Sequence, residues 1–527
     1  MKLFKEANKH LTITFRIALL ITFFIIILAF IFPSSFQTIT SQMRHFIDIH
    51  FTWYYLILVT AIVIISIILI FSPIGKIRLG DPCSKPEHST FSWLAMLFSA
   101  GMGIGLVFYG AAEPLSHYAI NSPEAELYSQ QALRDAFKFT FFHYGIHAWS
   151  IYAIVALALA YFQFRKKEKT LISVTLKPLI GERVNGIIGK LIDALTIVAT
   201  VAGVATTLGF GASQINGGIS FLFGVPHNFR IQLLIIVIAT LLFMTSALSG
   251  IGKGVKILSN INVYIAIALL ILAMIVGSDV KMLNTFAQGL GDYFRDFLRL
   301  SLRTSPGNQN QQEWIRNWTI FYWAWWISWS PFVGIFIARI SKGRTIREFL
   351  TFVILVPSLF SFLWFSVFGV MSTEAVTASP TIAELPLEQI LFGTFLQYPL
   401  GFFMAIVAVI LVFSFFITSA DSATYVLAMQ SEDGTLNPHN SVKIIWGVML
   451  ALIAIALMAA GGLTALQNVM ILLAFPFSII ICFIIISLII ELKYEQSEMG
   501  LYIKPHTYPK KDEPFRSYEN DEGNLRH

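Results

Sequence analysis

Long uninterrupted runs of apolar residues are the feature that most limits what this chain can fold into. The runs reach about 20 residues, the length that an α-helix needs to cross the hydrocarbon core of a bilayer. Of the 527 residues, 56% are hydrophobic and 13% are charged, whereas soluble domains carry about 25% charged residues. The sequence lacks the short alternating segments of a transmembrane β-barrel. It therefore predicts an all-α polytopic membrane protein.

Twelve transmembrane helices are expected. The first run follows Lys2, Lys5 and Lys9, but no small-residue cleavage site comes after it, so we interpret it as a retained helix and not as a signal peptide. The expected helices cover residues 15–33, 53–72, 93–112, 139–162, 190–212, 230–249, 257–277, 318–340, 349–370, 402–429, 443–460 and 468–490.

Basic residues predict the orientation. One set of alternate connections, together with both chain ends, holds 27 of the 36 Lys and Arg residues. Because such residues concentrate on the cytoplasmic side, both termini are predicted to be cytoplasmic, with the protein surrounded by the lipid of the plasma membrane. The same bias accounts for the net charge of +6, so no nucleic-acid partner is predicted. Cys83 and Cys482 lie far apart without metal-ligand spacing, which favours neither a disulfide framework nor a metal cluster.

Three glycines interrupt the third expected helix, in SAGMGIGLVFYGAAEP (residues 99–114). Gly101, Gly103 and Gly105 each weaken a helix by up to about 1 kcal/mol relative to Ala. An unwound segment offers backbone carbonyls to a cation or amides to a carboxylate. The alternative is close helix packing, since Gly101 and Gly105 form a small-xxx-small pair.

Aromatic residues gather in the fourth expected helix, in HYGIHAWSIY (residues 143–152). The two histidines are one turn apart, but no third ligand accompanies them, so a metal site is not favoured. Tyr144, Trp149 and Tyr152 are candidates for a binding surface, with ordinary aromatic packing as the alternative.

The eighth expected helix contains FYWAWWISWSPF (residues 321–332), with four tryptophans ahead of a Ser-Pro pair that is expected to break the helix. Trp318 and Trp323 suit the aromatic belt at the membrane interface. Trp329 lies roughly 16 Å beyond Trp318 along a helix, about halfway through the hydrocarbon core. Electron-rich indole faces at that depth can enclose a cation. A quaternary ammonium group suits such a cage because it carries charge without a strong hydrogen-bond donor.

The tenth expected helix contains a dense polar cluster, FFITSADSATY (residues 415–425). Its hydroxyls are hard oxygen ligands of the kind that sodium prefers. Asp421 is a functional candidate because a carboxylate within a membrane helix is costly. The alternative is that the hydroxyls bond back to their own helix.

The interruptions expected in the third and eighth helices are five helices apart. Paired interruptions indicate two inverted repeats with a binding site near the membrane midplane.

These stretches resemble the betaine/choline/carnitine transporter (BCCT) family, and its sodium-coupled glycine betaine transporters in particular. The resemblance runs from about Thr52 to Ile490, and its motifs are AGMGIGLVFYGAAEP, HYGIHAWSIY, FYWAWWISWSPFVGIFIARISKGRTIREF and FFITSADS. It implies a LeuT-like 5+5 inverted repeat, alternating access and often a homotrimer. The implied layout is a cytoplasmic N-terminus with two helices (1–92), a first five-helix repeat (93–277), an external connection with an interfacial helix (278–317), a second repeat (318–490) and a cytoplasmic tail (491–527).

The resemblance also implies roles for individual residues. Substrate would occupy an aromatic box beside the glycine stretch, formed by Tyr144, Trp149, Tyr152, Trp325, Trp326, Trp329, Gly101, Gly103 and Gly105. Tyr144 stands where the family usually has Trp. A sodium ion would be held by Ser99, Met102, Phe415, Thr418 and Ser419. A second sodium site of some relatives would use Thr200 and Phe332, but Val204 replaces its other Thr.

Gly105 bears on the expected substrate. Relatives that transport choline or couple to protons often carry an acid at this point, and its absence favours a zwitterion that brings its own carboxylate. The resemblance thus implies sodium-coupled uptake of glycine betaine as a compatible solute for osmoprotection, with Na⁺ as coupling ion and no cofactor. Choline or another trimethylammonium compound is the alternative substrate. An enzyme is not expected, because His143 and His147 lack catalytic partners in the sequence.

Overall fold

The computed structural model describes residues 12–101, 103–248 and 252–501. Within these ranges the regular elements are helical, apart from an isolated β-bridge between Arg78 and Thr345. Ten helical segments are long and apolar enough to cross a membrane, which confirms the all-α polytopic class. They are α2 (Ile13–Ile31), α3 (Pro33–Phe71), α6–η3 (Gln130–Arg165), α9 (Ile187–Phe223), α10 (Phe229–Leu248), the Leu258–Val276 part of α11 (Gly252–Val276), α14–α15 (Gln309–Ile340), α16 (Ile346–Ala378), α18 (Gly401–Ser431) and α19 (Asn440–Glu498).

The expected helices correspond to these segments with three main differences. The second expected helix, 53–72, is the second half of α3, which begins at Pro33. The third expected helix is divided into α4 (Thr90–Gly101) and α5 (Ile104–Leu115), as the glycine stretch indicates, and each half has 12 residues. The eleventh and twelfth are the two arms of α19, whose 59 residues would extend about 88 Å as a straight helix. α19 bends at Gly461 and Gly462, where the backbone is not helical and Gly462 has a φ of 62° that favours glycine.

The eighth expected helix is continuous through its Ser-Pro pair, so the expected break was wrong. α15 (Phe321–Ile340) follows α14 (Gln309–Ile315) and a π-helical turn, η6 (Arg316–Ile320). Pro331 cannot donate to the carbonyl of Ile327, and the Ser330 hydroxyl donates to that carbonyl instead, at 2.8 Å. Of the two interruptions that indicated inverted repeats, the structure shows the one in the third helix. The division into two repeats stays a prediction.

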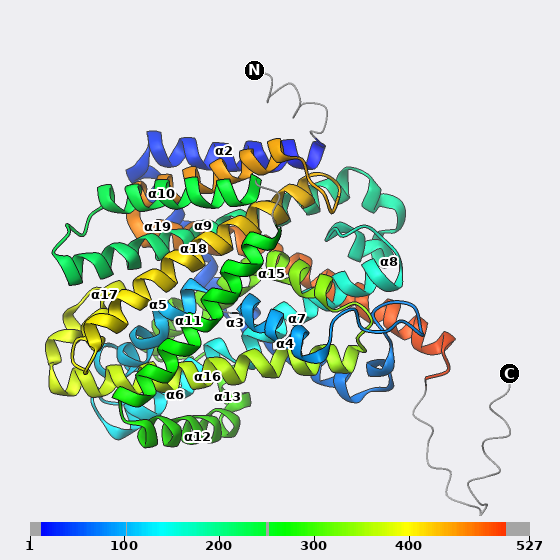
Figure 1. Cartoon of the computed structure of the whole chain (residues 1–527). Helices are drawn as coiled ribbons and strands as arrows, with labels where there is room; N and C mark the ends of the chain where they lie inside the picture. Colours follow the sequence, from blue (N-terminus) through cyan, green and yellow to red (C-terminus); the bar gives the residue numbers. More distant parts are fainter. Residues whose placement is uncertain (1–11, 102, 249–251, 502–527) are drawn as a thin grey trace, which may run out of the picture.

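Trp323 lies inside the protein, so its expected place in an interfacial belt was also wrong. Its side chain is 1% exposed, and its ring stacks on His147 with 5.7 Å between centroids. α15 lies in the middle of the bundle, in contact with α7 (Ile146–Ala160), α9 and α19 (Figure 1). Trp318 is partly buried and meets the ring of His117 edge-on.

The connection before α15 forms the helix that its sequence predicts. α12 (Asp279–Arg295) lies along the edge of the bundle against α6 (Gln130–Tyr144) and α16, and α13 (Phe297–Ser301) follows it (Figure 1). Tyr293 is buried, whereas Phe294 and Leu298 are exposed, so one face of this connection packs on the protein. Between α12 and α13, hydrogen bonds from Arg295 lower the pKa of the Asp296 carboxyl to about 2.

Short elements link the long helices. They are η1 (Pro73–Lys76), η2 (Ser116–Ile120), η3 (Tyr161–Arg165), η4 (Ser173–Leu176), α8 (Lys177–Ile180), η5 (Gly181–Asn185), η7 (Pro380–Glu384) and α17 (Leu387–Phe395).

Candidate functional site

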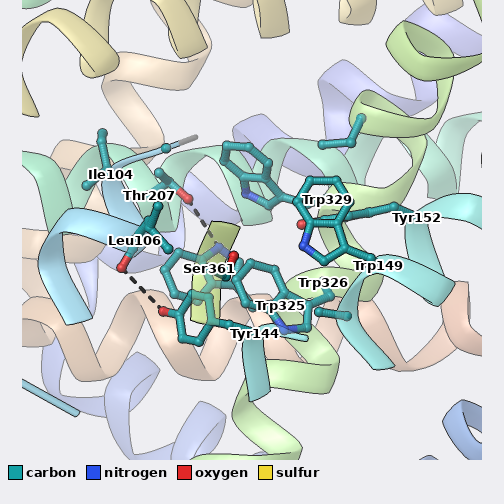
Figure 2. A pocket seen from close by; sticks show the side chains of 14 residues that line it. Ile104, Leu106, Tyr144, Trp149, Tyr152, Thr207, Trp325, Trp326, Trp329 and Ser361 are labelled. Atoms are coloured by element: carbon teal, nitrogen blue, oxygen red, sulfur yellow. Dashed lines mark hydrogen bonds between the residues drawn. The ribbon is translucent and has the colours of Figure 1, made fainter. Parts of the chain in front are cut away.

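A buried pocket lies between α5, α6, α7, α9, α15 and α16 (Figure 2). Aromatic rings form most of its wall, and none of its described lining residues is charged. The lining consists of Gly103, Ile104, Gly105, Leu106, Tyr144, Ala148, Trp149, Tyr152, Thr207, Trp325, Trp326, Trp329, Val333 and Ser361.

All six aromatic residues that the resemblance assigns to the substrate box line this pocket, and so do Gly103 and Gly105. Gly101 is the last residue of α4, and its surroundings lie outside the described part of the chain. The sequence did not indicate Ile104, Leu106, Ala148, Thr207, Val333 or Ser361 as lining residues. These are small or apolar side chains in apolar helices, and nothing in their spacing separates a pocket wall from ordinary helix packing.

Gly145 brings the aromatic residues of the fourth helix to different sides of the pocket. It separates α6 from α7, and a Cβ at this position would lie 2.5 Å from both the Phe141 carbonyl oxygen and the Phe362 ring. Because the helix is interrupted here, the carbonyl of His143 is free to accept a hydrogen bond from Trp326 Nε1 at 3.0 Å. The interruption thus fixes the ring of Trp326 beside the end of α6.

The rings of α15 form a stack along one side of the pocket. Trp325 and Trp326 are nearly parallel, with an interplanar angle of 6° and 5.3 Å between centroids (Figure 2). Tyr144 and Tyr152 meet Trp326 edge-on, at 5.3 and 6.0 Å. Trp325 Nε1 donates to Thr207 Oγ1 at 3.1 Å. Neighbouring helices therefore hold these rings in place, and their electron-rich faces can bind a cation.

The cavity has a volume of about 50 Å³, room for a few water-sized groups. The aromatic rings thus enclose a narrow space, in which a small ligand would contact several ring faces at once.

Gly105 is in close contact with the pocket wall. A Cβ at Gly105 would lie 2.9 Å from Cη2 of Trp325, whereas a Cβ at Gly103 would meet no atom within 4 Å. The absence of a side chain at Gly105 is therefore also a steric requirement of the Trp325 ring.

Gly105→Ala should displace Trp325 and weaken the binding of a small organic cation in this pocket about tenfold, because overpacking of this kind costs roughly 1–3 kcal/mol. A titration followed by intrinsic tryptophan fluorescence measures the Kd, and Gly103→Ala should have a clearly smaller effect. Equal Kd values for the two variants would contradict the steric role of Gly105.

The residues assigned to a sodium ion are only partly described. Met102 lies outside the described residues, and the side chain of Ser99 is not described. Phe415 and Thr418 are buried on α18, with Ser419 partly buried next to them. Thr418 Oγ1 is 3.1 Å from the Ser414 carbonyl oxygen and accepts from Nδ2 of Asn262 at 3.3 Å.

Two side chains place this part of α18 near the interrupted third helix. A Cβ at Gly211 on α9 would lie 2.8 Å from Cδ1 of Ile104, the first residue of α5, and 3.0 Å from the ring of Phe416. The start of α5 and the polar segment of α18 thus converge on the same point of α9. Backbone carbonyls and hydroxyls can meet there.

The residues of the second sodium site lie on α9 and α15. Thr200 is buried, and its hydroxyl donates to the Thr196 carbonyl at 2.8 Å. Phe332 is buried against Trp329. The two helices approach closely at Gly203, where a Cβ would lie 2.4 Å from Ser328 Oγ. Val204 is buried and offers no hydroxyl to this site.

His143 and His147 are bonded to different groups. His147 interacts with the Tyr293 hydroxyl at 3.1 Å and with Ser301 Oγ at 2.8 Å. His143 interacts with Glu113 at 2.6 Å and with Thr319 Oγ1 at 3.0 Å. The two histidine rings therefore contact different partners.

A family model described as "BCCT, betaine/carnitine/choline family transporter" matches residues 13–497 of the chain. The chain belongs to the BCCT family. Among its BCCT relatives, the glycine betaine transporter OpuD of Bacillus subtilis (strain 168) is 53% identical over 93% of this chain and 96% of the relative. An ectoine/hydroxyectoine transporter of Virgibacillus pantothenticus is 41% identical over 89% and 93% of the two chains. A high-affinity choline transport protein of Escherichia coli (strain K12) is 37% identical over 84% and 66%.

Membership in the BCCT family agrees with the resemblance on which the site assignments rest. This BCCT protein is a multi-pass membrane transporter, not an enzyme. Its pocket of tryptophan and tyrosine rings is the candidate substrate site.

Proposed function

We propose that this BCCT transporter takes up glycine betaine together with sodium ions and thereby supplies the cell with a compatible solute under osmotic stress. The protein would lie in the plasma membrane as a homotrimer, with both termini of each chain in the cytoplasm. Transport would follow an alternating-access mechanism. The sodium gradient supplies the energy, and the ions bind between the interrupted third helix and the polar segment of α18.

The observation that carries this proposal is the convergence of six aromatic rings from α6, α7 and α15 on one buried, uncharged pocket. A trimethylammonium group fits such a wall because its charge is spread over methyl groups that contact the ring faces. The relative with 53% identity is a glycine betaine transporter. None of the described lining residues is acidic, which favours a substrate that carries its own carboxylate.

The test is uptake of labelled glycine betaine by the purified protein in proteoliposomes with an inward sodium gradient. We expect saturable uptake that falls at least tenfold when potassium replaces sodium. Equal uptake in the two salts would refute sodium coupling, and a lack of betaine uptake in either salt would refute the substrate.

Choline, or another trimethylammonium compound, is the second candidate substrate. It is favoured by the choline transport proteins among the relatives and shares the ammonium group. Competition of labelled betaine by a panel of betaine, choline, carnitine and ectoine separates these substrates. Betaine should compete at the lowest concentration.

A further inference from the structure

A buried carboxylate lies behind the aromatic pocket. Glu113 on α5 is 0% exposed, and the Tyr322 hydroxyl donates a hydrogen bond to its Oε2. The Tyr322 ring stacks on Trp326, with an interplanar angle of 16° and 5.7 Å between centroids. It also lies parallel to Trp325, within 13°. One side of Tyr322 thus contacts the wall of the pocket, and its hydroxyl contacts the carboxylate.

Two histidines bind the other oxygen of Glu113. Nδ1 of His143 is 2.6 Å from Oε1, and Nε2 of His117 is 3.3 Å from the same atom. Nε2 of His143 is 3.0 Å from the Thr319 hydroxyl. With both rings neutral, each donates one N–H to Glu113 and His143 accepts from Thr319. Three donors therefore face the Glu113 carboxyl group, whereas Nδ1 of His117 has no hydrogen-bond partner in the described part of the chain.

The cluster is arranged as a hydrogen-bond network and not as a metal site. Ligands of a tetrahedral ion with bonds of about 2.0–2.1 Å lie roughly 3.3 Å apart. The 2.6 Å between His143 and Glu113 is a hydrogen-bond distance.

No Lys or Arg in the described part of the chain is bonded to Glu113. Arg303 lies over the Trp314 ring, which contacts His117, but its Nε binds Glu124 at 3.1 Å. A carboxylate charge buried here is costly unless it is paired, so a cation bound close to Glu113 would favour the ionised form of this side chain.

The network also reaches the glycine stretch. The Tyr144 hydroxyl is 3.3 Å from the Tyr322 hydroxyl and 3.3 Å from the Gly105 carbonyl oxygen, and it has one proton for these two acceptors. Figure 2 shows Tyr144 in the pocket wall. Both Tyr144 and Gly105 line the pocket. A change of charge at Glu113 therefore changes the hydrogen bonding of the pocket wall.

We propose that Glu113 is a positioning residue that supplies the negative charge for the quaternary ammonium group and acts on the pocket through Tyr322. The proposal rests on the proposed function, because it assumes a cationic group between the aromatic rings. The charge is screened from the substrate by an aromatic ring, which suits a zwitterion whose carboxylate a bare acid would repel.

The test compares Glu113→Gln, which removes the charge and keeps the size, with Glu113→Asp, which keeps the charge. Betaine uptake is measured in proteoliposomes, and binding is measured in detergent by the change in intrinsic tryptophan fluorescence. Glu113→Gln should raise both Km and Kd about tenfold, whereas Glu113→Asp should raise them less. Tyr322→Phe, which keeps the ring and removes the bridging hydroxyl, should match Glu113→Gln, and the double variant should be no worse. Glu126→Gln, an exposed Glu that follows the same helix, is the control.

A Kd for Glu113→Gln within twofold of the wild-type value would overturn the proposal. Equal increases of Kd in Glu113→Gln and Glu113→Asp would also overturn it, because they would indicate a structural role for Glu113. If Glu113→Gln does not reach the membrane, the proposal is tested with Tyr322→Phe. An unchanged Kd in Tyr322→Phe would overturn it. Failure of the proposed function is a separate result, because wild-type protein would then neither transport betaine nor respond to it. The same variants would in that case be compared with whichever compound of the substrate panel the wild type transports.

Discussion

Trp326→Ala should raise the Km for glycine betaine by about 30-fold. The Trp326 ring touches the pocket walls of three helices, since it stacks on Trp325, meets Tyr144 and Tyr152 edge-on and binds the His143 carbonyl. A desolvated cation–π contact contributes about 2 kcal/mol, which corresponds to this change in Km. Uptake kinetics in proteoliposomes measure it, with the amount of inserted protein determined in parallel.

Two variants separate the loss of a binding ring from the loss of packing. Trp446→Ala removes an equally large side chain that is buried on α19 and binds Ser431 Oγ at 2.8 Å. It should lower the stability and leave the Km unchanged. Trp326→Phe keeps an aromatic face and should have a smaller effect than Ala. If Trp446→Ala raised the Km as much as Trp326→Ala, the ring of Trp326 would have no specific part in binding.

Thr418→Val should raise the sodium concentration for half-maximal uptake about tenfold, with a smaller change in the Km for betaine at saturating sodium. Val has the shape of Thr but no hydroxyl, and a lost polar contact in a buried site costs roughly 1–3 kcal/mol. Sodium titrations of betaine uptake measure the effect.

Thr424 provides the matched control on the same helix. Both side chains are buried, and both hydroxyls donate to a carbonyl one turn back in α18, Thr424 to Ala420 at 2.7 Å and Thr418 to Ser414 at 3.1 Å. Thr418 Oγ1 in addition accepts from Nδ2 of Asn262 at 3.3 Å. Thr424→Val should leave the sodium dependence unchanged. An unchanged sodium dependence in Thr418→Val would remove this hydroxyl from the proposed ion site.

The steric role of Gly105 adds to the argument from its missing acid. A carboxylate placed there would meet Trp325, since a Cβ alone comes within 2.9 Å of that ring. The Trp325 ring therefore leaves room only for a glycine at position 105. An acidic side chain at position 105 would require a smaller residue, or another ring position, at Trp325.

Much of the candidate site could be predicted because its residues belong to recognisable local stretches. The clustered aromatic residues of α6, α7 and α15 and the glycines around residue 103 stand out from the aliphatic residues that make up most of an apolar helix. Glu113 also stands in the quoted glycine stretch, but its histidine and tyrosine partners come from η2, α6 and α15. Only the packing of these elements shows that the carboxylate lies behind the pocket.

The sequence by itself determined the class of the protein and the positions of most of its apolar helices, because the bilayer directly constrains helix length and residue type. The residues of the aromatic box came from the resemblance to the BCCT family, and their role in substrate binding stays a prediction. Only the tertiary structure decided that Trp323 is buried, that α15 continues through Pro331, and that Thr207 and Ser361 line the pocket. The reason is that lipid and the protein interior are both apolar. An apolar helix therefore carries no pattern that distinguishes the face turned to lipid from the face turned to a neighbouring helix or a pocket.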